Sequence, residues 1–401
     1  MKNVLFVDDE PRVLSGLQRM LRPMRHEWNM TFVNSGREAL DKLAAAPFDV
    51  IVTDMRMPEM DGAELLHHVS ERHPDTIRIV LSGQTDDETA MRVVDLAHQC
   101  LAKPCDPERL KHTLQRASAL RGVLSDPGLE KLVSKMDHLP SLPSLYGELL
   151  KELKSPQSTS QRVAKIVAKD VGMTTKTLHL VNSAFFGLRY NVTSLDQAIA
   201  LLGMKTVRSL AMTVQVFSQF ESIKVADFSV QGIMDHSVAT GTYAKQIAAI
   251  EGRKEYADEA FMAGLLHDTG RLVLLDRMPE KYAETLTLSK ESKIPLVQAE
   301  KDVFGATHAE VGSYLLGLWG LPDPTLEALA YHHNPDECLH RQFSPLTAVH
   351  AANSLGQSEA ETLPEWKKLP LCMSYLESMD LADHVTDWRN VCIAKTDNDS
   401  N

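Results

Sequence analysis

The sequence predicts a small doubly wound α/β domain followed by a larger all-α domain. In the first third of the chain, short apolar runs alternate with helical patterns, and this alternation gives a parallel sheet with helices on both faces. From Leu129 to about Asp383 the chain shows no convincing strand alternation, and helical periodicity dominates. A length of 401 residues is sufficient for two or three domains of ordinary size.

The composition is that of an ordinary globular protein, and it excludes several functional classes. The chain has no apolar run long enough to span a membrane, and its N-terminus enters a strand without the anatomy of a signal peptide. Its five scattered cysteines form no CxxC pair, which favours reduced thiols and a cytoplasmic location. A formal net charge of −12 argues against direct DNA binding, which requires a basic face.

The central strand of the α/β domain is predicted at residues 50–54, which have the sequence Val-Ile-Val-Thr-Asp. A continuous apolar run of this kind is typical of a parallel strand that is buried on both faces. Asp54 falls at its C-terminal end, where open α/β sheets bind ligands. Three further apolar runs also end in polar residues, namely Asp8-Asp9, Ser82 and Lys103-Pro104.

These strand ends predict a phosphoryl acceptor. Placed side by side, they bring together three carboxylates, a hydroxyl group and an ammonium group. Three close carboxylates repel one another unless a hard cation neutralises them, and Mg²⁺ prefers such oxygen ligands. A carboxylate beside Mg²⁺ and a lysine is suited to accept a phosphoryl group, because both cations offset the charge of the group in transfer.

Helices are expected between these strands, near residues 11–24, 36–46, 61–73, 86–97 and 106–120. The second begins with Ser35-Gly36-Arg37-Glu38, which offers a capping oxygen and an acid in the first turn. The apolar pattern of the fifth continues to Leu124, so this helix lies on its own sheet and its end packs on the second domain or forms a dimer seam.

The first domain resembles the receiver domain of two-component response regulators, and the resemblance covers residues 1–122. It rests on motif residues in the order of that family, which are Asp8, Asp9, Asp54, Ser82, Lys103 and Pro104. The resemblance implies a flavodoxin-like fold with five parallel strands and phosphorylation by a cognate histidine kinase. It also implies a cis peptide bond between Lys103 and Pro104.

The same resemblance implies the roles of the pocket residues. Asp54 is the implied phosphoacceptor, and Ser82 and Lys103 are the groups that close on the phosphoryl oxygens. Mg²⁺ is implied at a site made by Asp8, acting through water, with Asp9, Asp54 and the backbone carbonyl of Arg56. One departure concerns Cys100, which occupies a position where receivers usually carry an aromatic residue that rotates on phosphorylation.

The domain boundary is expected where Ser125-Asp126-Pro127-Gly128 interrupts the chain, with Pro127 suited to the first position of a helix. We therefore expect a linker at 123–131, a helical domain at 132–357, and a helical extension with a polar tail at 358–401. Helices of the second domain are predicted near residues 142–153, 158–169, 172–184, 194–201, 204–219, 227–249, 255–276, 279–291, 307–318, 323–332 and 344–356.

Histidines are placed at informative positions of the helical region, each on a predicted helix or at its end. They occur as His236, the pair His267-Asp268, His308, and the pair His332-His333. Neighbouring residues of a helix point about 100° apart, so such pairs can direct both side chains toward one wide cavity. Imidazoles in this arrangement suit transition metals, and Arg271, one turn after His267, could hold a phosphate oxygen.

This region resembles the HD superfamily of metal-dependent phosphohydrolases, and more closely its HDOD subfamily. The resemblance rests on several motifs, which include Leu139-Pro140-Ser141-Leu142-Pro143, Asn182-Ser183-Ala184-Phe185-Phe186-Gly187, Leu266-His267-Asp268-Thr269-Gly270-Arg271, Thr307-His308-Ala309-Glu310 and Tyr331-His332-His333-Asn334-Pro335. HDOD domains are generally regarded as signalling output modules without established catalysis, and many have lost metal ligands.

Two departures bear on catalysis. HD hydrolases carry a further aspartate ligand, and the candidate position here is Asn353, whose neutral amide is a weaker ligand. The related phosphodiesterases of cyclic-di-GMP carry a Gly-Tyr-Pro signature, which does not occur in this chain. The histidines are therefore either buried hydrogen-bonding residues of a helical core or ligands of a transition metal such as Fe, Zn, Mn or Ni.

We interpret the chain as a two-component response regulator in which phosphorylation of Asp54 controls a signalling or protein-interaction output domain. The expected partners are the histidine kinase, a downstream signalling protein and a second copy of the chain, with no DNA or membrane. The alternative is a receiver-regulated phosphohydrolase acting on a nucleotide or cyclic dinucleotide, and metal analysis distinguishes the two.

Overall fold

The computed structural model describes residues 2–82, 96–120, 126–134, 157–182, 192–212, 230–357 and 370–393, with a few shorter pieces between them. The chain divides into two compact units, of which the first contains residues Met1–His138 and the second contains most of the remaining chain. None of the described helices is long and apolar enough to cross a membrane.

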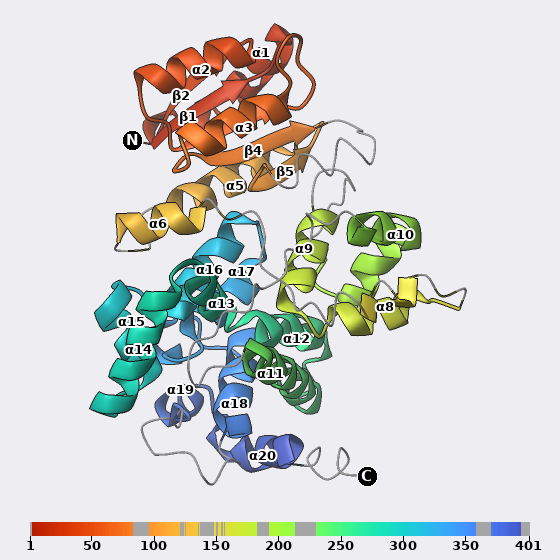
Figure 1. The fold of residues 1–401 in the computed structure, drawn as a ribbon, viewed down its shortest axis with the longest axis vertical. Helices are drawn as coiled ribbons and strands as arrows, with labels where there is room; N and C mark the ends of the chain where they lie inside the picture. Colours follow the sequence, from red (N-terminus) through yellow and green to blue (C-terminus); the bar gives the residue numbers. More distant parts are fainter. Residues whose placement is uncertain are drawn as a thin grey trace. The chain divides into compact units, whose positions relative to one another are not determined.

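A five-stranded parallel sheet with the strand order β2-β1-β3-β4-β5 forms the centre of the first unit (Figure 1). Its strands are β1 (Lys2–Val7), β2 (Trp28–Val33), β3 (Val50–Asp54), β4 (Ile77–Ser82) and β5 (Gln99–Ala102). This order is that of flavodoxin-like doubly wound sheets, so the predicted fold class is confirmed. The described helices of the unit are α1 (Pro11–Met20), α2 (Gly36–Ala45), α3 (Gly62–Arg72), α5 (Pro107–Leu120) and α6 (Pro127–Ser134).

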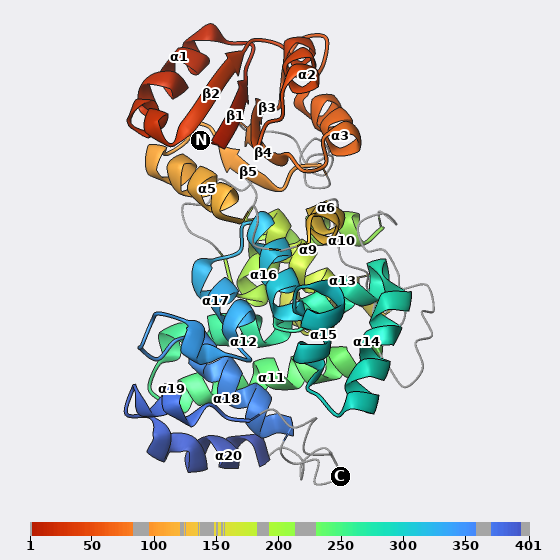
Figure 2. The ribbon, with the colours of Figure 1, turned by 90° about the vertical axis from the view of Figure 1, so that its left-hand side faces the viewer.

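The central strands of the sheet carry apolar side chains on both faces, because helices cover both faces of the sheet. Helices α2 and α3 lie on one face, and α1 and α5 lie on the other (Figure 2). All five residues of β3 are buried, as the continuous apolar run predicted. Side chains of α2 and α3 pack with alternate strand residues in one core cluster, which includes Leu5, Ile51, Val80, Leu43 and Leu66.

Several local predictions for the first unit can be compared with the structure. The Ser35 hydroxyl accepts a hydrogen bond from the Glu38 N–H at 3.2 Å and caps α2, as predicted. The sequence analysis did not locate strand β2. This strand lies at the edge of the sheet and is only partly buried, so its sequence is mixed and contains no continuous apolar run. Helix α6 begins at Pro127, inside the predicted linker, and the helix expected at 86–97 falls mostly outside the described residues.

The second unit is helical throughout its described residues, as predicted. Its helices are α8 (Ser160–Val167), α9 (Val171–Val181), α10 (Leu195–Met212), α11 (Val230–Ile250), α12 (Ala257–Leu266), α13 (Thr269–Arg277), α14 (Pro279–Ser292), α15 (Leu296–Phe304), α16 (His308–Leu318), α17 (Asp323–Tyr331), α18 (Pro345–Gln357), α19 (Met373–Glu377) and α20 (Val385–Ile393). Helix α20 packs against α11 and α18 through the fully buried Trp388, whose indole N–H donates to Glu251 at 2.7 Å.

In this unit, one break between helices and one whole helix were not predicted. The helix predicted at 255–276 is interrupted at His267-Asp268, where α12 ends and α13 begins. The helices predicted at 194–201 and 204–219 correspond to the two parts of α10, which are separated by a kink where Gly203 adopts a φ of 75°, and residues 213–219 lie outside the described residues. Helix α15 had not been predicted, and the helix expected at 142–153 lies mostly outside the described residues.

Two glycine contacts bring the histidine-bearing helices unusually close together. A Cβ atom on Gly264 of α12 would lie 2.6 Å from the Cα atom of Gly241 in α11. A Cβ atom on Gly270 of α13 would lie 1.9 Å from the carbonyl oxygen of His308, where α16 begins. No side chain fits at such distances, so these positions require glycine for the backbones to meet.

Candidate functional site

The predicted phosphoacceptor lies at the C-terminal edge of the sheet. Asp54 ends β3, and the parallel pairing of Val7 with Thr53 places the residue that follows β1, Asp8, beside it. Both acids are largely buried, with exposed fractions of 2% for Asp8 and 8% for Asp54, and Ser82 at the end of β4 is buried as well. The sheet topology therefore gathers these strand ends as the sequence predicted.

Lys103 joins the two buried carboxylates. Its ammonium group lies 2.6 Å from Asp8 Oδ2 and also contacts Asp54 Oδ1, and its backbone N–H donates to the Ser82 carbonyl at 2.7 Å. Burial disfavours the charged ammonium, but hydrogen bonds to Asp54 and Asp8 outweigh it and raise the pKa of Lys103. The peptide bond to Pro104 is cis, as the resemblance implied.

The loop after β3 fixes the other oxygen of the acceptor. Asp54 Oδ2 accepts a hydrogen bond from the Arg56 backbone N–H at 2.8 Å. Helix α3 starts directly behind this loop, where the Gly62 N–H donates to the Met55 carbonyl at 2.9 Å. A Cβ atom on Gly62 would lie 2.3 Å from the Asp54 carbonyl oxygen, so this close return of the chain depends on glycine.

The pocket has the charge and donor types that a divalent cation requires. Asp8 Oδ1 accepts the Glu10 N–H at 2.9 Å, while Asp9 is partly exposed at the mouth of the pocket. Lys103 offsets only one of the three carboxylate charges, and hard oxygen donors of this kind suit Mg²⁺. The Cys100 side chain is buried in the core cluster of the sheet, where it packs as a small apolar residue.

A second group of side chains converges in the helical unit. All seven residues predicted as candidate metal ligands belong to it, and they come from α11, the α12–α13 junction, the start of α16, the end of α17 and α18: His236, His267, Asp268, His308, His332, His333 and Asn353. The ring centroids of His267 and His332 are 5.0 Å apart, and those of His236 and His267 are 5.1 Å apart. These residues are called the histidine cluster below.

Asp268 occupies the centre of the histidine cluster. Its Oδ1 lies 3.2 Å from His308 Nε2 and 3.4 Å from His267 Nε2, and its Oδ2 lies 2.9 Å from Arg271 Nη1. Burial disfavours the carboxylate, but Arg271 and the two imidazoles outweigh it and hold the pKa of Asp268 well below its usual range. Arg271, predicted as a phosphate-binding candidate, is thus paired with Asp268.

Two imidazoles of the cluster direct lone pairs toward Asp268. The Nδ1–H groups of His267 and His332 donate at 2.7 Å to the carbonyls of Gly264 and Leu329, so each Nε2 carries a lone pair. Neither Nε2 has a hydrogen-bond partner among the described residues. Burial lowers the pKa of His267 to about 4 and that of His332 well below its usual value, so both rings stay neutral at pH 7.

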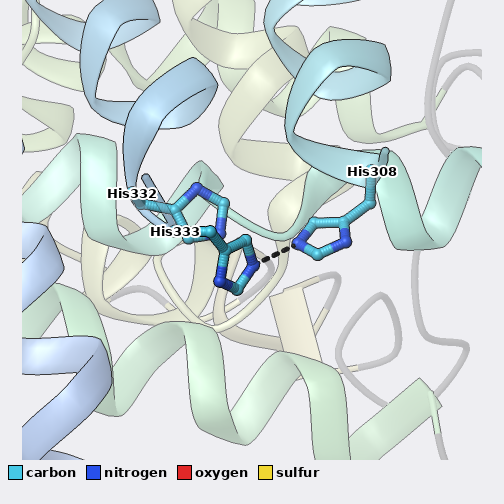
Figure 3. Close-up of side chains that lie close together, drawn as sticks. All are labelled: His308, His332 and His333. Carbon is cyan, nitrogen blue, oxygen red and sulfur yellow. Dashed lines mark hydrogen bonds between the residues drawn. The ribbon is translucent and has the colours of Figure 1, made fainter. Parts of the chain in front are cut away.

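His308 is held by an acid that the sequence analysis had missed. Glu300 of α15 is fully buried, and its Oε2 accepts the Nδ1–H of His308 at 2.6 Å and the backbone N–H at 2.9 Å. Burial opposes protonation of His308, but Glu300 and Asp268 outweigh it and raise the pKa of the ring. Its other nitrogen lies 3.0 Å from His333 Nε2, and Figure 3 shows this contact between the two rings.

The remaining contacts support the cluster from α18. Asn353 Oδ1 lies 3.0 Å from His236 Nε2, so the amide that replaces the expected acid faces the histidine of α11. His350, also missed by the sequence analysis, donates from Nδ1 to the His332 carbonyl at 2.8 Å. Its Nε2 accepts the Cys372 N–H at 2.9 Å, and this tautomer is therefore fixed. The only sequence signal that His350 supports the cluster was its position one helical turn before Asn353.

Comparisons with known families agree with both parts of the chain. The response regulator receiver domain matches residues 4–115, and the HDOD domain matches residues 139–335. The pocket and the fold of the first unit thus define the class, which is that of receiver-containing signalling proteins. More particularly, the chain carries a receiver domain followed by an HDOD domain, the two domains that the sequence analysis predicted, and in this content it is similar to response regulators.

Individual relatives cover different parts of the chain. The MmoQ response regulator of Methylococcus capsulatus is 25% identical, covers 63% of this chain and 98% of its own, and superposes with a TM-score of 0.50. An uncharacterized protein of Treponema pallidum is 26% identical over 239 residues, or 58% of this chain and 46% of its own. The hydrogenase transcriptional regulatory protein HoxA of Cupriavidus necator is 39% identical over 125 residues, or 31% of this chain and 25% of its own. The chain thus spans half or less of these two curated relatives.

Proposed function

We propose that Asp54 accepts a phosphoryl group from a histidine kinase and that this modification controls the HDOD domain. The observation that carries the proposal is the buried pair Asp8 and Asp54 at adjacent strand ends, with the Lys103 ammonium bound to both. An ammonium held at this point can neutralise charge on a group that is transferred to Asp54.

The transfer forms a bond between phosphorus and a carboxylate oxygen of Asp54 and breaks the bond between phosphorus and the kinase imidazole. Asp54 Oδ2 is held by the Arg56 N–H, so the carboxylate is oriented before the donor arrives. Lys103 then moves its contact from the acceptor carboxylate to the phosphoryl oxygens, with the Ser82 hydroxyl on the neighbouring strand as a second donor. Asp9, Asp54 and the Arg56 carbonyl would hold Mg²⁺, which supplies charge stabilisation for the phosphoryl group.

A small phosphodonor tests the proposal directly. The full chain is incubated with acetyl phosphate and Mg²⁺, and phosphorylated protein is separated on a phosphate-affinity gel. We expect a shifted band for the wild type and for Asp41→Asn, an exposed acid of α2, and no shifted band for Asp54→Asn. Equal phosphorylation of Asp54→Asn would refute the assignment.

We propose a protein-interaction role for the HDOD domain, in which it binds a downstream signalling protein. A second candidate function, a metal-dependent phosphohydrolase, is favoured by one specific observation. The Nε2 lone pairs of His267 and His332 converge on the buried Asp268, and imidazole lone pairs with a carboxylate are the donor set of a transition metal. Asn353 supports the interaction role instead, because its neutral amide supplies less charge to a metal.

Elemental analysis distinguishes these two functions. Protein purified with and without oxygen is assayed for Fe, Zn, Mn and Ni, together with His267→Ala and the exposed control His67→Ala of α3. If the domain is a phosphohydrolase, the wild type and His67→Ala should contain about one metal ion or more per chain and should hydrolyse a phosphodiester. His267→Ala should lose both the metal and the hydrolysis. If the protein contains no metal in either preparation, the phosphohydrolase is excluded and the protein-interaction role is supported.

A further inference from the structure

A second set of metal-ligating side chains lies outside the histidine cluster. Glu327 belongs to α17, and Cys338 and His340 belong to the segment that connects α17 with α18. One carboxylate oxygen, the thiol sulfur and one ring nitrogen of these residues all lie within 4.8 Å of one another. Carboxylate, thiolate and imidazole are the three ligand types that zinc takes in proteins. These three residues are called the Glu-Cys-His site below.

The donors of the Glu-Cys-His site differ in depth. The Cys338 side chain is buried, with 3% of its surface exposed. His340 Nδ1 lies 2.8 and 3.0 Å from the two oxygens of Glu327, and the side chains of these residues are 73% and 30% exposed. A bound ion would therefore have the thiolate beneath it and the imidazole at its outer side. One coordination position faces solvent, where water can occupy it.

The backbone that carries Cys338 and His340 is already held in place by neighbouring groups. The Cys338 N–H donates to the Pro335 carbonyl at 3.1 Å, and the Cys338 carbonyl accepts from the Arg341 guanidinium. Arg341 also donates to the Asp336 carbonyl at 2.8 Å, and its guanidinium lies over the ring of Tyr375 at 5.6 Å. Because these contacts order the segment, little conformational entropy remains to be lost when the ligands bind an ion.

The charges around the site also favour a cation. Burial raises the pKa of Tyr331, and the nearby carboxylates of Glu327 and Glu337 raise it further. The imidazole of His340 partners Glu327 in this arrangement. A divalent cation would offset the charge of these carboxylates.

We propose that Glu327, Cys338 and His340 bind one Zn²⁺ ion, with water as the fourth ligand. Zinc bonds of about 2.3 Å to sulfur and about 2.0–2.2 Å to nitrogen and oxygen place tetrahedral ligands about 3.4–3.8 Å apart. The pair His340 and Glu327 must open slightly, and the sulfur, which lies within 4.8 Å of the other two donors, must approach them. Binding releases the Cys338 thiol proton to solvent, because the thiolate is the form that ligates metals.

Zinc in this site would restrain the segment that carries the histidine pair. Glu327 lies on α17 shortly before His332 and His333, while Cys338 and His340 lie shortly after them. An ion bound to all three residues closes a loop around the pair and fixes the end of α17. The segment would then exchange its backbone amides more slowly in the presence of zinc.

Cobalt binding tests the proposal, because Co²⁺ replaces Zn²⁺ and gives a sulfur-to-cobalt charge-transfer band only when a thiolate is bound. The histidine cluster contains no cysteine, so this band reports the Glu-Cys-His site alone. Metal-free full-length protein is titrated with Co²⁺ and then with Zn²⁺. We expect one band that saturates at one ion per chain, that Zn²⁺ removes, and that persists in His267→Ala.

Variants of the site and matched controls decide the outcome. Cys338→Ser should eliminate the band, whereas Cys105→Ser, a half-buried thiol of the first unit, should retain it. His340→Gln should weaken Co²⁺ binding at least about tenfold, because loss of even an outer-shell group typically costs that much. This variant alters an exposed side chain, so it remains informative if Cys338→Ser fails to fold. A wild type without the band, or unchanged affinity in His340→Gln, would overturn the proposal.

Discussion

At the scale of single residues, the account depends most on Lys103, the cation that contacts both buried carboxylates. In metal-free buffer, Lys103→Met leaves Asp8 and Asp54 without their ammonium partner. We expect the free energy of unfolding of the first unit to fall by about 1–3 kcal/mol, less than for a fully buried pair because Lys103 is partly exposed. Chemical denaturation followed by circular dichroism measures this change.

The control for this variant is Lys111→Met, which removes an ion pair with the exposed Glu108 on α5. This change should alter the free energy of unfolding by no more than about 0.5 kcal/mol. Added Mg²⁺ should restore part of the stability lost in Lys103→Met, because it neutralises the same carboxylates. Equal effects of the two lysine variants would contradict the pocket electrostatics described here.

Glu300 provides a second prediction at this scale. Glu300→Gln keeps the shape of the side chain but removes the charge that faces His308 Nδ1 at 2.6 Å. Because hydrogen bonds to charged groups are the stronger ones, we expect the helical unit to lose about 1.5–3 kcal/mol in free energy of unfolding. Glu291→Gln on the exposed side of α14 should change it by about 0.5 kcal/mol at most. A similar value for both variants would show that the buried contact contributes no stability.

The sequence was sufficient to predict the pocket residues because each lies at the end of an apolar strand, in a position that the pattern marks. Glu300 was missed because nothing in its local sequence distinguishes a buried acid from an exposed one, and the only signal for His350 was its spacing from Asn353. Both are defined by contacts across helices, with His308 and with the His332 carbonyl. Such partners become visible only when the helices are assembled.

At the scale of elements, the glycine contacts between helices decide whether the histidine cluster can form. Gly270→Ala would place a methyl group 1.9 Å from the His308 carbonyl oxygen, so α13 and α16 must separate. We expect a loss of about 3 kcal/mol in the free energy of unfolding of the helical unit. Gly356→Ala in α18 meets only ordinary contacts at 3.4 Å and should be neutral or slightly stabilising. A neutral Gly270→Ala would show that this crossing is looser than described.

Element boundaries were predicted less well than element types. The break at His267-Asp268 was missed because apolar periodicity continues through Leu266 and Leu272, and only the tertiary fold requires both side chains to point inward. Strand β2 was not assigned residues because an edge strand buries only part of its side chains and so lacks a continuous apolar run. Both errors come from information that lies outside the local sequence.

At the scale of the whole molecule, the proposal requires that phosphorylation of the first unit alters the second. The phosphoryl group adds about −1.5 to −2 charges at one buried carboxylate, and this local change must reach the HDOD domain to regulate it. We expect acetyl phosphate to change amide hydrogen exchange within residues 230–357 as well as within 2–120. Exchange that changes only within 2–120, with Asp54 fully phosphorylated, would contradict intramolecular control of the HDOD domain.

The central claim is that Asp54 itself carries the phosphoryl group, and the most direct test locates the modified atom. Protein treated with acetyl phosphate and Mg²⁺ is reduced with borohydride, which converts an aspartyl phosphate to homoserine, and its peptides are analysed by mass spectrometry. The account predicts homoserine at position 54, dependent on Mg²⁺ and strongly reduced in Lys103→Met. Homoserine at another aspartate, with position 54 unmodified, would contradict it.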